Sequence, residues 1–63
     1  MKNFNQILVT RTYAGKDLKI GFVQTEVNGM MANDYYYIYK GQKPEGPYAD
    51  EGEAYGGWYR ANG

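Results

Sequence analysis

Cysteine, histidine and serine are all absent from this sequence, and each absence excludes a class of site. Without cysteine the chain forms no disulfide, and without cysteine or histidine it lacks the ligands of the usual structural zinc sites. Covalent catalysis commonly needs a serine or cysteine nucleophile, and acid-base catalysis at neutral pH most often needs histidine. We therefore expect a protein that is not an enzyme and that holds no metal and no cofactor.

An excess of charge of one sign is also absent. Seven Lys and Arg residues balance seven Asp and Glu residues, so the chain has no net field to attract duplex DNA or anionic lipid. The longest aliphatic run is Ile7-Leu8-Val9, which is shorter than the apolar core of a signal peptide or a membrane span. The sequence predicts a cytoplasmic protein with no membrane partner.

Glycine and tyrosine are abundant, with nine and eight residues among 63. A chain this short buries only roughly 60% of the surface that its unfolded form exposes, so hydrophobic gain and lost chain entropy nearly cancel. The 17% aromatic share argues against disorder. We expect one domain over residues 1–63 that associates with another protein or with itself as a homodimer.

Three segments have the alternation and composition of β-strands: residues 6–13, residues 18–27 and the tyrosine-rich residues 35–39. Residues 14–17 predict a turn in which Gly15 takes positive φ. The apolar parity shifts after Gly21, which predicts a bulge near that residue. Asn28-Gly29 predicts a type I′ turn, because both central positions of that turn need positive φ.

Residues 41–47 contain two Gly and two Pro and are expected to form a loop. In residues 50–61, Asp50 and Glu53 have the spacing of a capping box, which favours a short helix. Gly56-Gly57 between two aromatic residues is equally compatible with a tight hairpin. We predict an α+β fold: a small three-stranded antiparallel sheet, a meander, with one short C-terminal helix packed on one face.

The tyrosine run is the most informative segment for function. In a strand, Tyr35, Tyr37 and Tyr39 face one side of the sheet while Tyr36 and Ile38 face the other. One helix covers only one face, so we expect tyrosines on the open face to bind a partner. The alternative is that the rings only stabilise the sheet by pairing across strands. The predicted partner-binding residues are Tyr35, Tyr37, Tyr39, Lys40, Lys43 and Tyr48.

Two resemblances bear on function. Gly57-Trp58-Tyr59-Arg60-Ala61 resembles a short segment of SH3 domains, but the early Ala-Leu-Tyr motif of that family is absent. Trp58 as a core residue under a helix is the simpler interpretation. In size and composition the chain resembles small accessory proteins of bacteriophages, many of which bind and inhibit a host protein in the host cytoplasm.

These observations favour a small non-enzymatic interaction module that binds, and as a phage accessory protein inhibits, a host protein through its tyrosine-rich sheet face. The first alternative is a single-stranded nucleic-acid-binding protein that stacks bases on the same rings, with Lys40 and Lys43 along the backbone. The second alternative is a homo-oligomeric structural protein. Nucleic acid is the less favoured partner, because the neutral chain supplies no electrostatic attraction.

Overall fold

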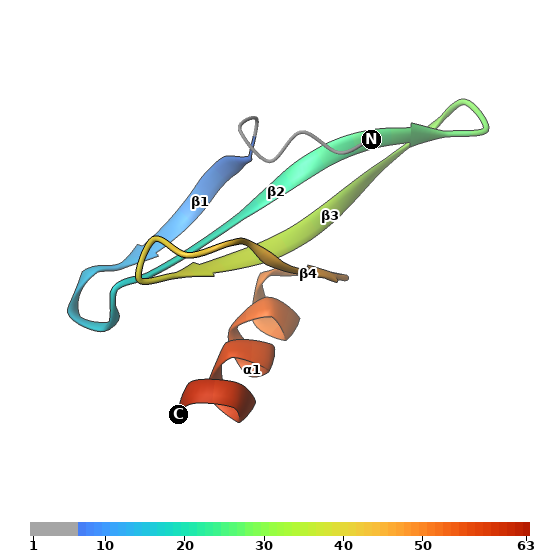
Figure 1. The fold of residues 1–63 in the computed structure, drawn as a ribbon. Helices are drawn as coiled ribbons and strands as arrows, with labels where there is room; N and C mark the ends of the chain where they lie inside the picture. Colours follow the sequence, from blue (N-terminus) through green and yellow to red (C-terminus); the bar gives the residue numbers. More distant parts are fainter. Residues whose placement is uncertain (1–6) are drawn as a thin grey trace.

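The computed structural model describes residues 7–63, which form one antiparallel sheet and one helix (Figure 1). The strands are β1 (Leu8–Tyr13), β2 (Leu18–Val27), β3 (Met30–Tyr39) and β4 (Glu45–Tyr48), and they lie side by side in that order. Helix α1 (Glu51–Asn62) follows β4 and packs on one face of the sheet. The α+β class and the C-terminal helix are confirmed, whereas the sheet has four strands instead of three.

The fourth strand lies partly within residues 41–47, which the sequence analysis assigned to a loop. It pairs with β3 through Tyr35 opposite Tyr48 and Tyr37 opposite Glu45. Pro47 cannot donate a ladder hydrogen bond, but β4 is an edge strand with a neighbour on one side only. Proline is tolerated at such an edge, so its presence did not exclude a strand.

The β2–β3 hairpin forms as predicted. Asn28 and Gly29 have φ values of 54° and 79°, and Val27 pairs with Met30 across the turn. Asparagine and glycine adopt this left-handed conformation at low cost, which is why the dipeptide fixes both the turn and the register. The register then runs without interruption to Leu18 opposite Tyr39.

The β1–β2 connection differs from the prediction in detail. Residues Ala14–Lys16 form a 3₁₀ turn, and the positive φ of 53° falls on Asp17 instead of Gly15. The predicted bulge lies on β1, between Val9 and Arg11, opposite Gly21 and its neighbour. A Cβ at Gly21 would come within 2.5 Å of the Leu8 carbonyl oxygen. Glycine therefore permits the close approach of β1 at the irregular position.

Helix α1 begins at the predicted cap, which decides against a hairpin in residues 50–61. The Asp50 side chain accepts a 2.8 Å hydrogen bond from the Glu53 backbone N–H, and this satisfies one of the free donors of the first turn. The adjacent Glu51 carboxylate accepts hydrogen bonds from Thr10 and Arg11 of β1. These bonds link the N-terminus of the helix to β1, which is the other edge strand of the sheet.

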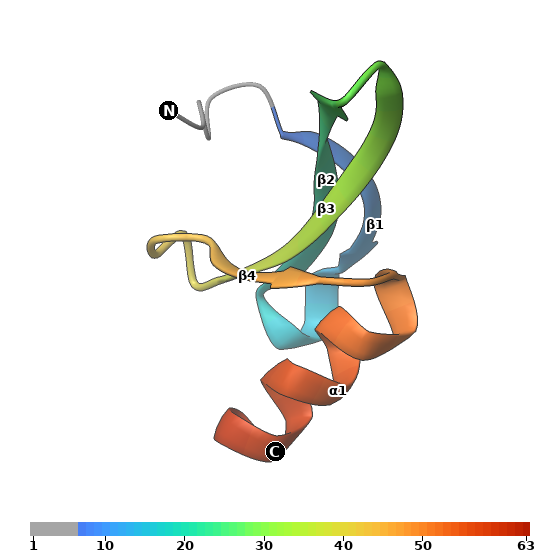
Figure 2. The ribbon, with the colours of Figure 1, turned by 90° about the vertical axis from the view of Figure 1, so that its right-hand side faces the viewer.

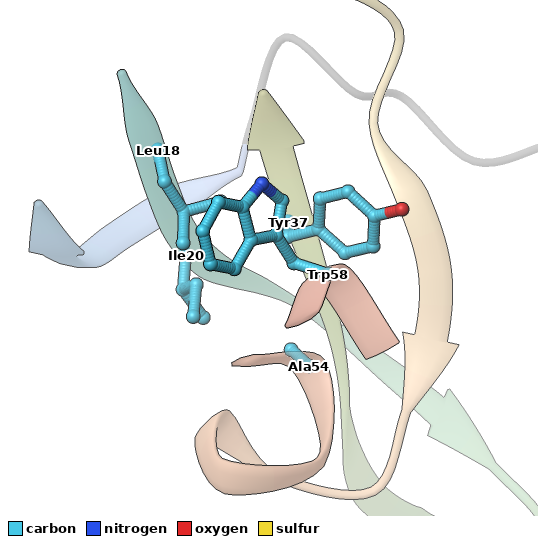
Figure 3. Packing of buried hydrophobic residues seen from close by; sticks show 5 residues of the cluster. All are labelled: Leu18, Ile20, Tyr37, Ala54 and Trp58. Atoms are coloured by element: carbon cyan, nitrogen blue, oxygen red, sulfur yellow. The ribbon is translucent and has the colours of Figure 1, made fainter. Parts of the chain in front are cut away.

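The core lies between α1 and the end of the sheet where β1 turns into β2. Figure 3 shows its five buried residues, which are Leu18, Ile20, Tyr37, Ala54 and Trp58. Their clustering at one end leaves the tip of the β2–β3 hairpin well outside the part that the helix covers (Figures 1 and 2). The molecule is accordingly elongated, with extents of 38 × 20 × 17 Å.

Candidate protein-binding surfaces

The helix covers the sheet face that carries Tyr35, Tyr37 and Tyr39. Partners in the ladder share a face, and Tyr37 lies opposite Ile20 in the core. The Tyr37 side chain is buried, at 7% exposure. Tyr35, Tyr39 and Tyr48 are half-buried and pack against the same core. The structure thus decides which face of residues 35–39 is buried, a choice that the alternation left open, and partner binding by Tyr35, Tyr37 and Tyr39 remains a prediction.

Contacts between aromatic rings account for this burial. Tyr37 stacks on Tyr48 of the neighbouring strand with ring centroids 6.2 Å apart, and Tyr39 meets Trp58 of the helix edge-on at 5.6 Å. Such pairs add about 0.5–1.5 kcal/mol beyond the area they bury. The rings thus stabilise the sheet and its contact with the helix, as the alternative interpretation of the tyrosine run held.

The electrostatic surroundings of Tyr37 agree with a structural role. Burial raises the pKa of its hydroxyl above the usual value, and the neighbouring Tyr48 and Glu45 raise it further, whereas a hydrogen bond with Asn62 lowers it. A phenol with a raised pKa stays protonated and neutral at physiological pH. Tyr37 therefore offers a hydrogen-bonding hydroxyl inside the protein and no charge to a partner.

Tyr36, on the opposite face of the sheet from Tyr37, is also buried. Tyr36 is 2% exposed, and a Cβ at Gly46 of β4 would come within 2.8 Å of the Tyr36 ring carbon Cδ2. The strand thus buries residues of both parities, which the alternation rule did not anticipate. A stacking platform for nucleic-acid bases would need exposed rings, and Tyr36 and Tyr37 do not supply them.

The two predicted lysines are exposed. The Lys40 ammonium lies 5.1 Å from the centroid of the Tyr39 ring, and Lys43 lies in the connection that leads to β4. Lys16 similarly lies over the ring of Trp58, at 5.6 Å. We define the loop end as the end of the sheet that carries the β1–β2 and β3–β4 connections. With Lys19 near the start of β2, this end has four lysines and two acidic residues, Asp17 and Glu45.

The exposed apolar surface lies at the opposite end of the sheet. We define the distal arm as residues 24–33, the outer part of the β2–β3 hairpin, all of which are exposed except the half-buried Thr25. Its large apolar side chains Val27, Met30 and Met31 are 58%, 73% and 59% exposed. Val27 and Met30 pair on one face of the ribbon, and Met31 lies on the other face opposite Glu26.

The strands that flank the hairpin do not reach the end of the distal arm. Within the described residues, β1 pairs with β2 only as far as Phe22, and β4 pairs with β3 only from Tyr35. Leu8 and Val9, at the beginning of β1, add two more exposed apolar side chains near the base of the distal arm. Sequence reasoning missed this surface, although apolar residues on both sides of Asn28-Gly29 were its signal.

A cavity of about 640 Å³ lies at the loop end. Its walls come from the ends of β1 and β3, the start of β2 and the β1–β2 turn. Ile38 supplies apolar surface, and Lys19 and Lys40 supply positive charge beside the carboxylate of Asp17. The cavity lies within the range of roughly 300–1,000 Å³ that is typical of binding pockets.

Comparison with family models, curated proteins and solved structures finds no match for this chain. Residues 7–63 contain no cluster of acidic side chains suited to holding a metal ion. Among the same residues, no helix has both the length and the apolar character needed to cross a bilayer. The geometry of the exposed surfaces is thus the basis on which function has to be inferred.

Proposed function

We propose that this protein is a small protein-binding module whose contact surface is the distal arm. The observation that carries the proposal is the exposure of Val27, Met30 and Met31 on a ribbon that the helix does not cover. Burying such a side chain is worth roughly 1.5–3 kcal/mol relative to leaving it in water. Single exposed apolar residues are ordinary, whereas the tip of this hairpin carries Val27 and Met30 on one face and Met31 on the other.

The backbone of the distal arm supports the same function. A two-stranded ribbon is marginal in water by itself and gains from contact with further structure. Among residues 7–63, no pairing of β1 or β4 extends along its outer edges near the tip, so a partner can add hydrogen bonds there. Methionine suits such a surface, because its flexible, polarizable side chain adapts to the shape of a partner.

The tyrosine residues support binding indirectly. By holding β2 and β3 against the helix, the aromatic core fixes the base of the hairpin and therefore the direction of the distal arm. A pre-organised surface pays less entropy on association than a flexible one. We therefore assign the contact to the distal arm and the positioning of the distal arm to the aromatic core.

Affinity capture with a matched control tests this function. Tagged wild-type protein is compared with a Met30→Thr, Met31→Thr variant, in which threonine keeps the strand propensity, and with a Tyr59→Gln control. Tyr59 is exposed at 57%, close to the 59% of Met31, but lies on the helix. We expect the captured protein, whether another chain or a second copy, to be lost only with the methionine variant.

Retention of every captured protein by the methionine variant would remove the distal arm as the contact surface. If the captured protein is an enzyme, its activity in the presence of the wild-type and methionine-variant proteins tests the prediction of an inhibitor. Inhibition that is equal for both proteins would again place the contact elsewhere.

A further inference from the structure

Part of the lining of the cavity at the loop end comes from the face of the sheet that the helix leaves bare. Lys19 pairs with Ile38 on β3 and with Thr12 on β1, and this row alternates with the Leu18 and Tyr39 row that faces the helix. Thr12, Lys19 and Ile38 all line the cavity. An apolar floor with ammonium groups on the wall suits an apolar ligand that carries negative charge.

The distal arm has this chemistry. Its exposed side chains are Val27, Met30 and Met31, and Glu26 is its charged residue. Residues 24–33 contain no Lys or Arg. The lysine-bearing end and the acidic, apolar end therefore differ in sign of charge within one protomer.

We propose that the tip of the distal arm of one copy docks into the loop-end cavity of a second copy, so that the chain associates with itself head to tail. The inference rests on the proposed function and names the partner of the same surface. Met30 and Met31 enter against Ile38, while Glu26 approaches the ammonium group of Lys19 or Lys40. Charged groups arranged in this way fix register and orientation more than they add affinity.

The distal arm and the cavity of one protomer cannot contact each other, because they lie at opposite ends of an elongated molecule. The distal arm and the cavity lie at the two ends of a sheet in a molecule 38 Å long, so their contact must be intermolecular. A contact between two distal arms would instead bring the Glu26 carboxylates of both copies together, with no cation from residues 24–33. Charge complementarity thus favours the cavity of a second copy over its distal arm.

A head-to-tail contact has a predictable consequence for assembly. Each bound copy leaves one distal arm and one cavity free, so association continues as an open chain or closes as a ring. An apolar side chain that enters a pocket elsewhere on a neighbouring copy is a known way to build such assemblies. The mass of the wild-type protein should therefore increase with concentration beyond that of a dimer, unless a two-membered ring closes.

Light scattering during size-exclusion chromatography tests the inference with two complementary variants. The arm variant is Met30→Thr, Met31→Thr, and the cavity variant is Lys19→Glu, Lys40→Glu. All four positions are exposed, and circular dichroism checks that both variants fold. We expect each variant alone to associate at least about tenfold more weakly than wild type, and a tenfold loss corresponds to about 1.4 kcal/mol.

The equimolar mixture of the two variants is the decisive sample. The arm variant retains an intact cavity and the cavity variant an intact distal arm, so the mixture should form a dimer of one copy of each. Lys43→Glu is the matched control, because Lys43 is a neighbouring lysine that does not line the cavity. This control should associate like wild type. Adding Glu26→Lys to the cavity variant should restore association between copies of that one variant, because the two charges of the contact are then exchanged.

Three results would overturn the inference. A cavity variant that associates like wild type would show that the distal arm binds somewhere else on the second copy. A mixture that contains only monomers would exclude the complementary contact. Wild-type protein that stays monomeric at every concentration, yet loses a captured protein through the arm variant, would overturn self-association while leaving the proposed function intact.

Discussion

The two ends of the β2–β3 hairpin place similar residues in opposite environments. At the base, Ile20 and Tyr37 pair across the strands and are buried under the helix. At the tip, Val27 and Met30 pair in the same ladder and remain exposed. Helix α1 covers the base of the hairpin and does not extend to the tip. Similar apolar residues therefore become core where the helix covers them and stay exposed where it does not.

Removal of the largest core side chain should give the largest effect on stability. Trp58→Ala should cost about 3–5 kcal/mol, because it empties the centre of the helix–sheet contact. A domain of this size has a stability of similar magnitude, so the variant should be largely unfolded. Urea denaturation followed by circular dichroism measures the loss.

Trp58→Phe should cost much less than Trp58→Ala. The indole Nε1 is buried without a hydrogen-bond partner among the described residues, so phenylalanine removes an unsatisfied donor while it keeps most of the ring contacts. Equal losses for the two variants would indicate that Nε1 has a partner that matters for folding.

Two adjacent helix glycines should respond in opposite directions to alanine. A Cβ at Gly57 would collide with the hydroxyl and ring of Tyr48, so Gly57→Ala should cost about 1–3 kcal/mol by overpacking. At Gly56 the nearest atom is the flexible end of Arg60 at 3.4 Å, so Gly56→Ala should stabilise by about 0.5–1 kcal/mol through helix propensity. Thermal unfolding of both variants gives the comparison, and a stabilising Gly57→Ala would refute the close helix–β4 contact.

Acid should weaken the link between β1 and the helix. Hydrogen bonds from Thr10 and Arg11 lower the pKa of the Glu51 carboxyl relative to its unfolded value of 4.5. The resulting stability is present above that value and is lost as pH falls through the lower folded pKa. Glu51→Gln should therefore reduce the decline in stability below pH 4.5. Unchanged acid sensitivity in urea titrations at several pH values would contradict this role.

The smallest effect on monomer stability is expected at the tip. Met30→Thr and Met31→Thr should each change the free energy of unfolding by no more than about 0.5 kcal/mol, because both side chains are exposed and lie away from the core. Urea denaturation at a protein concentration where association is absent provides the measurement. A loss comparable to that of Gly57→Ala would show that the tip belongs to the folded core.

Local signals in the sequence predicted the parts of the fold that depend on local chemistry. Asn28-Gly29 determined the hairpin turn, because the turn requires positive φ at both residues. Asp50 determined the start of the helix, because its side chain caps the first turn. Neither feature depends on contacts that are distant in sequence.

Features that depend on tertiary contacts could not be predicted in this way. Alternation divided the tyrosines into two faces correctly, but the face that the helix takes is decided by the packing of Ala54 and Trp58. Strand β4 was missed because Pro47 argues against a strand in general and is harmless only at an edge. The distal arm was missed because exposure at the tip follows from the limited length of α1.

Side-chain oxidation by hydroxyl radicals, read out by mass spectrometry, compares the two ends of the molecule in a single measurement. At low protein concentration, we predict fast oxidation of Met30 and Met31 and slow oxidation of Tyr37 and Trp58, relative to the same residues in urea. At high protein concentration, Met30 and Met31 should become protected from oxidation, and Tyr37 and Trp58 should stay protected. Fast oxidation of Tyr37 together with protected methionines at low concentration would contradict the assignment of core and contact surface.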